Sequence, residues 1–178
     1  MPLKPWKVLE STYLHPRFRI DKCELPNGKY LNATIFEFGS WANVFAITKN
    51  NEVILIRQYR HGVREILWEI PGGAVDKGED PMEGVKRELL EETGYAAPEF
   101  VQVGKLYPNP AVQGNSMYYF LALNAEKVGG QSLDWGEEIE VKLIPLDKFL
   151  VMARRGELMH ALQIAGLFHV LAYLDRIK

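Results

Sequence analysis

The stretch DPMEGVKRELLEETG, residues 80–94, carries the clearest structural signal in the chain. Asp80 can cap the start of a helix, the proline after it suits the first helical position, and Glu83 completes a capping box. Gly94 can adopt the left-handed conformation that ends a helix. The sequence therefore predicts a helix from Pro81 to Thr93, which is roughly three turns.

Three glutamates share one face of this predicted helix. The spacing of Glu88, Glu91 and Glu92 places their carboxylates side by side, where they should repel one another. This acidic face borders the apolar stripe that contains Val85 and Leu89, so it does not point directly away from the core. A solvated helix face is the simpler interpretation of such a cluster. A cation site is the alternative.

The segment before the helix favours the cation site. Residues Ile70 to Val75 contain Gly72 and Gly73, which let the backbone turn tightly and bring a carbonyl oxygen close to a ligand. Mg²⁺ and Mn²⁺ prefer carboxylate and carbonyl oxygens, with waters and substrate phosphates in the remaining positions. We therefore expect oxygen ligands to converge from the loop and the helix.

Gly73, Glu79 and the run Arg87–Tyr95 together resemble the Nudix box, and every defined position of that motif matches. The resemblance implies a Nudix α/β/α sandwich with a mixed β-sheet. It also implies hydrolysis of a nucleoside diphosphate linked to another moiety, which makes the protein a Mg²⁺-dependent enzyme.

Residue roles follow from the same resemblance, position by position. The glutamates that match Glu88, Glu91 and Glu92 hold the metals in Nudix enzymes, with Mg²⁺ as the expected ion and Mn²⁺ as an alternative. The arginine that matches Arg87 orients a glutamate by a charge-assisted hydrogen bond. The carbonyl of Gly72 is the expected backbone ligand.

Short β-prone runs and turn signals flank the box. The turn Leu25–Gly28 predicts an N-terminal antiparallel sheet. Strands are expected at residues 18–20, 30–38, 41–48, 52–59, 101–106, 117–123 and 140–144, and helices at 149–154 and 158–174. This mixture indicates an α/β fold with helices packed on a mixed sheet. We expect an N-terminal β-sheet extension, residues 1–43, and a Nudix hydrolase domain, residues 44–178.

The composition is that of an ordinary globular protein. The chain has 178 residues, of which 47% are hydrophobic, and one cysteine, Cys23, for which packing is the expected role. A net charge of −2 is too small to neutralise the phosphates of a polynucleotide. No run approaches the ~18 apolar residues of a membrane span, and the N-terminus is unlike a secretion signal. We expect a cytoplasmic protein without nucleic-acid or membrane partners.

Segments outside the box narrow the range of expected substrates. Ile56–Arg60 and Trp68–Pro71 resemble the stretch that leads into the box in ADP-ribose and nucleoside-diphosphate-sugar pyrophosphatases. That subfamily implies a homodimer with exchanged N-terminal strands. Pro110 matches a proline typical of the ADP-ribose group, although a rigid loop also explains it. Residues 111–116 lack the acidic residue that often follows this proline, so another nucleoside diphosphate sugar, such as GDP-mannose, competes with ADP-ribose.

Substrate-binding residues are expected on both parts of the chain. Arg60, and after it Arg57, could offer a guanidinium to the diphosphate, although surface ion pairs explain both arginines equally well. The subfamily resemblance implies that residues near Trp6 and Arg17 help to build the base pocket of the partner subunit. An isolated aromatic residue is more often a core or interface residue.

The general base is expected in a late acidic loop, Asp134–Glu140, that resembles a mobile loop of the subfamily. Glu140 is the first choice because a strand follows it and could hold it in place. Glu137 is the second choice, as base or as an additional metal ligand. Glu138 is expected to be solvated, and a solvated loop remains the alternative for the whole segment.

A different class of function also fits the fold. A binding or regulatory module could keep a Nudix fold and lose turnover. The intact box favours the enzyme, because loss of activity usually begins at the metal glutamates.

Overall fold

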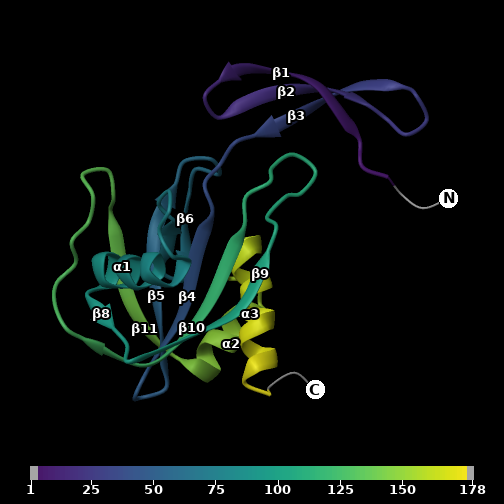
Figure 1. Ribbon diagram of the computed structural model, residues 1–178. Coiled ribbons are helices and arrows are strands. Elements are labelled where there is room, and N and C mark those ends of the chain that lie inside the picture. The colour runs from purple at the N-terminus through teal and green to yellow at the C-terminus, as the bar shows by residue number, and fades with distance from the viewer. Residues whose placement is uncertain (1–3, 176–178) are drawn as a thin grey trace. The chain divides into compact units, whose positions relative to one another are not determined.

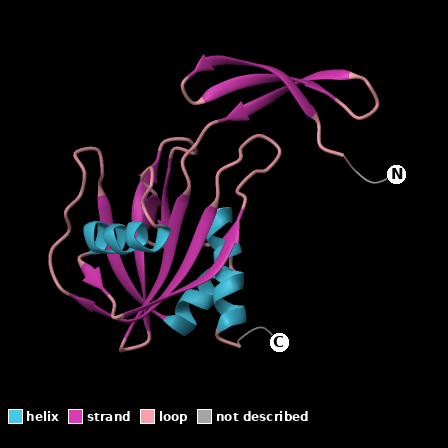
Figure 2. Ribbon diagram, viewed as in Figure 1, coloured by secondary structure: helices cyan, strands magenta, loops and turns pink. Residues whose placement is uncertain are grey.

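The computed structural model describes residues 4–175, and the chain divides into two units (Figures 1 and 2). The small unit contains the described residues up to Gly39 together with Tyr107–Ser116. The large unit contains Ser40–Leu106 and the described residues from Met117 onward. The boundary expected after residue 43 therefore falls inside a strand, because β4 spans Trp41–Thr48.

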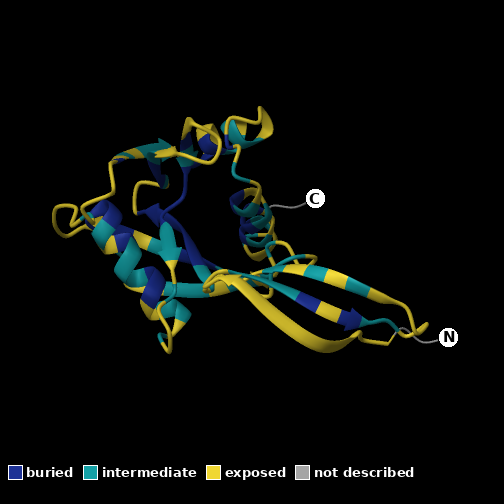
Figure 3. Cartoon of the chain, turned by 90° about the horizontal axis from the view of Figure 1, so that it is seen from above, coloured by how far each residue is buried: buried dark blue, intermediate teal, exposed yellow. Residues whose placement is uncertain are grey.

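The small unit is built on a three-stranded antiparallel sheet, as predicted. Its strands are β1 (Lys7–His15), β2 (Phe18–Glu24) and β3 (Tyr30–Phe36), in the order β1-β2-β3. In the turn between β2 and β3, Gly28 has a φ of +78°, and its N–H donates to the Leu25 carbonyl at 2.9 Å. Cys23 is buried on β2, which confirms its packing role. β1 is exposed throughout its length (Figure 3). Its sequence lacks the alternation of apolar and polar residues that would have predicted a strand there.

The large unit contains an eight-stranded mixed sheet. The central path runs in the order β11-β5-β4-β10-β8, with β6 paired to β5, β7 to β4 and β9 to β10. β4 and β10 are parallel, and the other paired strands are antiparallel. Besides β4, the strands are β5 (Glu52–Arg60), β6 (Glu65–Glu69), β7 (Gly72–Ala74), β8 (Tyr95–Ala96), β9 (Glu99–Leu106), β10 (Met117–Lys127) and β11 (Ile139–Pro145).

Helices cover both faces of this sheet, because apolar side chains of the central strands alternate between two cores. Phe45 and Leu55 belong to the core that contains residues of α2 (Leu146–Arg154) and α3 (Ala161–Tyr173). Val44 and Ile54 belong to the core beneath α1 (Pro81–Thr93). The large unit is therefore the α/β/α sandwich that the sequence predicted.

The box helix forms between the residues expected to cap it. The Asp80 carboxylate accepts from the Met82 N–H at 2.8 Å, and Gly94 has a φ of +71°. The Glu83 carboxylate instead accepts from Lys86 at 2.7 Å, so the structure shows the Asp80 half of the predicted capping box. These contacts confirm that local signals define this helix.

Other elements differ in their bounds. The last helix begins at Ala161 rather than residue 158, and the helix before it begins at Leu146 rather than residue 149. β6, β7 and β8 were not predicted, because runs of two to five residues carry little periodicity. Within residues 4–175 no helix combines the length and the apolar character needed to cross a membrane.

Gly166 sets the close approach of α3 to the sheet. A Cβ at this position would lie 2.3 Å from Cδ1 of Tyr119, whose ring is fully buried and whose hydroxyl donates to the Leu162 carbonyl at 2.7 Å. We expect Gly166→Ala to lower the free energy of unfolding by about 1–3 kcal/mol, although alanine adds ~1 kcal/mol of helix propensity. Chemical denaturation of the full chain measures this change.

Gly84→Ala on α1 is the matched control, because its Cβ would meet only the movable carboxylate of Glu79 at 2.9 Å. This variant should be neutral or slightly stabilising. Equal changes in the two variants would show that the Tyr119 contact does not limit the packing of α3.

Candidate active site

A cleft of about 940 Å³ lies in the large unit. Its walls come from the ends of β4, β5 and β10, from β6 and β7, and from the box helix, the acidic loop and the start of α3. Residues that line it include Asn43, Arg60, Glu69, Gly72, Gly73, Arg87, Glu88, Glu92, Asp134, Glu137, His160 and Gln163. The cleft therefore brings together most of the charged residues that the sequence singled out.

The glycine loop packs directly against the carboxylates of α1. Gly72 has a φ of +145°, and its N–H donates to Oε2 of Glu92 at 2.8 Å. A Cβ on Gly72 would lie 2.2 Å from the Ala42 carbonyl oxygen, and a Cβ on Gly73 would lie 2.6 Å from the Glu88 carboxylate. Position 72 therefore requires glycine, because of both its backbone conformation and the backbone atoms around it, whereas a side chain at position 73 would have to displace the Glu88 carboxylate.

Arg87 gathers the acidic side chains around it. Its Nη1 donates to Glu88 at 2.9 Å and to Glu91 at 3.1 Å, and its Nε donates to Glu79 at 3.2 Å. These charge-assisted hydrogen bonds, led by the one to Glu79, hold the pKa of Arg87 above its usual range. Arg87 thus orients glutamates from the loop before α1 and from the helix itself.

Burial places an electrostatic cost on the other carboxylates of the cleft. Glu92 is 4% exposed, and burial raises its pKa to about 8, with the charges of Glu88 and Glu137 adding to the effect. Burial also raises the pKa of Glu88. A bound cation would lower the free energy of these carboxylates in their charged form.

The donor set matches a hard divalent cation in its chemistry, since it consists of carboxylate and carbonyl oxygens. Within residues 4–175, however, no three acidic, histidine or cysteine side chains already surround a common cation position. Arg87 spans Glu88 and Glu91. A cation would therefore compete with this guanidinium for their carboxylates.

The two predicted substrate arginines have different surroundings. Arg60 lines the cleft and forms a two-pronged ion pair with Glu69, with Nε–Oε1 and Nη2–Oε2 distances of 2.7 and 2.6 Å. Arg57 pairs with Glu140 at 3.3 Å, its guanidinium lies 5.4 Å from the Trp68 ring centre, and it is not among the cleft-lining residues. Of these two arginines, only Arg60 lines the cleft.

The acidic loop contributes Glu137, not Glu140, to the cleft. Asp134 and Glu137 both line it, and the Asp134 N–H donates to the Glu137 carboxylate at 3.1 Å. The Glu137 charge contributes to the raised pKa values of Glu88 and Glu92, which places it near them. Glu140 lies on β11 opposite Arg57, with a side chain that is 56% exposed.

Three predicted binding residues belong to the small unit. Trp6 is 51% exposed, and Arg17 and Pro110 are exposed as well. Their part in base or sugar binding stays a prediction.

Sequence reasoning missed Glu69 and Gln163, which are buried and lie at the cleft. Each carried a usable signal. Glu69 is a charged residue within the apolar run Trp68–Ile70, and Gln163 interrupts the apolar face of the last helix. A polar side chain in such a position must find a partner.

Residues 39–162 match the NUDIX domain family, so the chain belongs to the Nudix family. This match covers the glycine loop, the acidic helix and the acidic loop.

Alignments with known relatives cover most of the chain. An ADP-ribose pyrophosphatase of Bacillus subtilis is 31% identical over 143 residues, which cover 80% of this chain and 77% of the relative. A GDP-mannose pyrophosphatase of Salmonella arizonae is 29% identical over 165 residues, covering 85% of each chain. The crystal structure of an ADP compounds hydrolase superposes with a TM-score of 0.84 at 22% identity, covering 99% of this chain and 100% of the other. This structural likeness supports the fold.

Proposed function

We propose that the protein is a Mg²⁺-dependent pyrophosphohydrolase of ADP-ribose or another nucleoside diphosphate sugar, such as GDP-mannose, and acts in the cytoplasm. Water adds to one phosphorus of the diphosphate as the bridging P–O bond breaks, which yields a nucleoside monophosphate and a sugar phosphate. One observation carries the proposal: the buried carboxylate of Glu92 and the partly buried carboxylate of Glu88 face a glycine loop in a cleft that also contains Arg60. The two pyrophosphatase relatives support this substrate class.

In this proposal, different residues of the cleft would bind the cation and the diphosphate. Glu88, Glu91 and Glu92, with the Gly72 carbonyl, would hold the metal. Divalent cations, which Nudix hydrolases generally use, neutralise diphosphate charge and lower the pKa of bound water. Nε and Nη2 of Arg60 donate to Glu69, and the other N–H groups of the guanidinium could donate to a phosphate oxygen.

A panel of nucleoside diphosphate sugars tests the activity. Incubation with ADP-ribose, GDP-mannose and UDP-glucose, with and without Mg²⁺, should release monophosphate from at least one compound only when Mg²⁺ is present. Chromatography of the products measures it. The alternative is a binding or regulatory module, and tight binding of these compounds without any turnover would favour that function instead.

The variant Glu92→Gln distinguishes the effect of Glu92 on the stability of the fold from its proposed role in metal binding. Glutamine can still accept the Gly72 N–H, and it removes a buried charge. Without metal we expect an equal or higher melting temperature than wild type. Millimolar Mg²⁺ should raise the melting temperature of wild type but raise that of Glu92→Gln much less, and turnover should fall by orders of magnitude.

Differential scanning fluorimetry with and without Mg²⁺ measures both effects. An unchanged Mg²⁺ response in Glu92→Gln would remove Glu92 from the proposed metal ligands. Full turnover in this variant would do the same.

We propose Glu137 as the general base, in place of the first choice Glu140. Glu137 lines the cleft, whereas Glu140 pairs with Arg57 on the neighbouring strand. Glu137→Gln should lower kcat about a hundredfold or more while substrate still binds. Glu138→Gln, at an exposed residue outside the cleft lining, is the control and should leave kcat unchanged. A larger loss of kcat in Glu140→Gln than in Glu137→Gln would reverse the assignment.

We also propose a homodimer with exchanged N-terminal strands. Large apolar side chains on β1, including Val8, Tyr13 and Leu14, are 53–61% exposed, which is costly unless a partner covers them. Trp6 and Arg17 would then contribute to base binding in the partner subunit. Light scattering at micromolar concentration should give twice the chain mass, and a monomer would contradict the proposal.

A further inference from the structure

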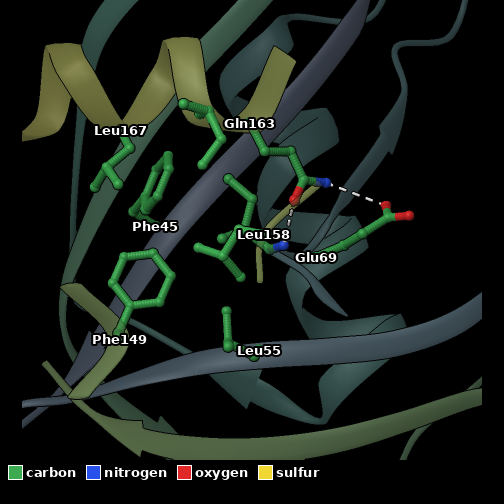
Figure 4. Close-up of a pocket in the computed structure, with 9 residues that line it drawn as sticks. Phe45, Leu55, Glu69, Phe149, Leu158, Gln163 and Leu167 are labelled. Carbon is green, nitrogen blue, oxygen red and sulfur yellow. Dashed lines mark hydrogen bonds between the residues drawn. The ribbon is translucent and has the colours of Figure 1, made fainter. Parts of the chain in front are cut away.

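The side-chain amide of Gln163 joins α3 to the strand and loop that form the floor of the cleft. Its Oε1 accepts from the Ile70 N–H at 2.8 Å, and its Nε2 donates to Oε2 of Glu69 at 3.1 Å (Figure 4). Gln163 is 7% exposed and Glu69 is 1% exposed. Both ends of the amide are therefore used, and the two contacts fix which end points to which residue.

Apolar side chains surround one side of this amide. It lies at the edge of a pocket of about 10 Å³ whose other walls include Phe149, Leu158 and Leu167 (Figure 4). An unpaired polar group in such an apolar setting would be unfavourable, so the hydrogen bonds hold one geometry.

One branch of the network reaches the substrate side of the cleft. Glu69 accepts from Gln163 through the same oxygen that accepts from Nη2 of Arg60 at 2.6 Å. The second oxygen of Glu69 accepts from Nε of Arg60. The orientation of the Arg60 guanidinium thus depends on the Glu69 carboxylate, which also accepts a hydrogen bond from Gln163.

The other branch reaches the acidic helix. Ile70 is followed by Pro71, whose carbonyl accepts from the Val44 N–H at 3.0 Å, and by Gly72, whose N–H binds Glu92. Gln163 is the side chain that anchors the start of this segment. Its hydrogen bond to Ile70 therefore limits where the Gly72 carbonyl and the Glu92 carboxylate can lie.

We propose that Gln163 is a positioning residue that sets both the Arg60 guanidinium toward the diphosphate and the Ile70–Gly72 segment toward the metal site. It lies just beyond residues 39–162, the segment that matches the family domain. The role of Gln163 rests on the proposed function, since it serves the same site. It makes the C-terminal helix part of the catalytic apparatus and not only a cover for the sheet.

Three variants of the full chain test this role. Gln163→Leu removes both hydrogen bonds, and Gln163→Glu keeps the acceptor for Ile70 but sets a second carboxylate against Glu69. Leu167→Ala, one turn further on α3 in the same pocket, disturbs packing without touching the network. The measurements are Mn²⁺ affinity of the free protein by calorimetry, melting temperature, and kcat and KM on the most active sugar nucleotide.

We expect Gln163→Leu to weaken Mn²⁺ binding and raise KM, each about tenfold. Gln163→Glu should keep more Mn²⁺ affinity but raise KM at least as much, with partial recovery of KM at lower pH as the paired carboxylates share a proton. Leu167→Ala should lower the melting temperature and leave Mn²⁺ affinity and KM within about twofold of wild type.

Two results would overturn the positioning role. One is a Gln163→Leu protein that is less stable but binds Mn²⁺ and substrate as wild type does. The other is a Leu167→Ala protein with the same losses as Gln163→Leu, because general loosening of α3 would then explain both. If wild type hydrolyses no sugar nucleotide, the proposed function fails, while Mn²⁺ affinity still tests the link from Gln163 to the loop.

Discussion

The hydrogen bond from the Gly72 N–H to the buried Glu92 carboxylate is the contact on which the cleft depends. It joins a glycine loop to the acidic face of α1 and lets a carboxylate with 4% exposure persist in the interior. One backbone N–H cannot offset the full cost of burying that charge, as the raised pKa of Glu92 shows. In the proposed function, a bound cation would supply the remaining stabilisation of the charged carboxylate.

The sandwich makes this arrangement rigid from both sides. The core beneath α1 contains Val85 and Leu89, which lie on the same helix as the acidic residues and fix its distance from the sheet. The opposite core packs α3 against the sheet, and Gln163 extends from α3 to the loop. Loop and helix are thus held by elements far from them in the sequence.

Local signals made the box helix and its glycines predictable. Asp80 and Gly94 cap the helix through contacts within a few residues, and Gly72 has the positive φ that favours glycine. These features are encoded next to where they act. The resemblance of the box to the Nudix motif implied the α/β/α sandwich, and the hairpin turns between apolar runs indicated a mixed sheet with helices packed on it.

Contacts set by strand register were not predictable in this way. Glu140 was the first choice for the base, but the pairing of β11 with β5 places it opposite Arg57. An ion pair was an equal alternative to substrate binding for Arg60, but the sequence did not indicate that the hairpin of β5 and β6 would bring Glu69 to it as the partner. Both outcomes depend on which residues face each other across strands, which composition and periodicity do not specify.

The central claim is that the carboxylates of α1 and the glycine loop form a divalent cation site beside Arg60. Anomalous scattering from crystals grown with Mn²⁺ and a non-hydrolysable nucleoside diphosphate sugar tests it most directly. We expect Mn²⁺ about 2 Å from carboxylate oxygens of Glu88 and Glu92 and from the Gly72 carbonyl, with a diphosphate oxygen on the same ion. Mn²⁺ bound elsewhere, or a diphosphate bound in the cleft at saturating Mn²⁺ with no ion on these oxygens, would contradict it.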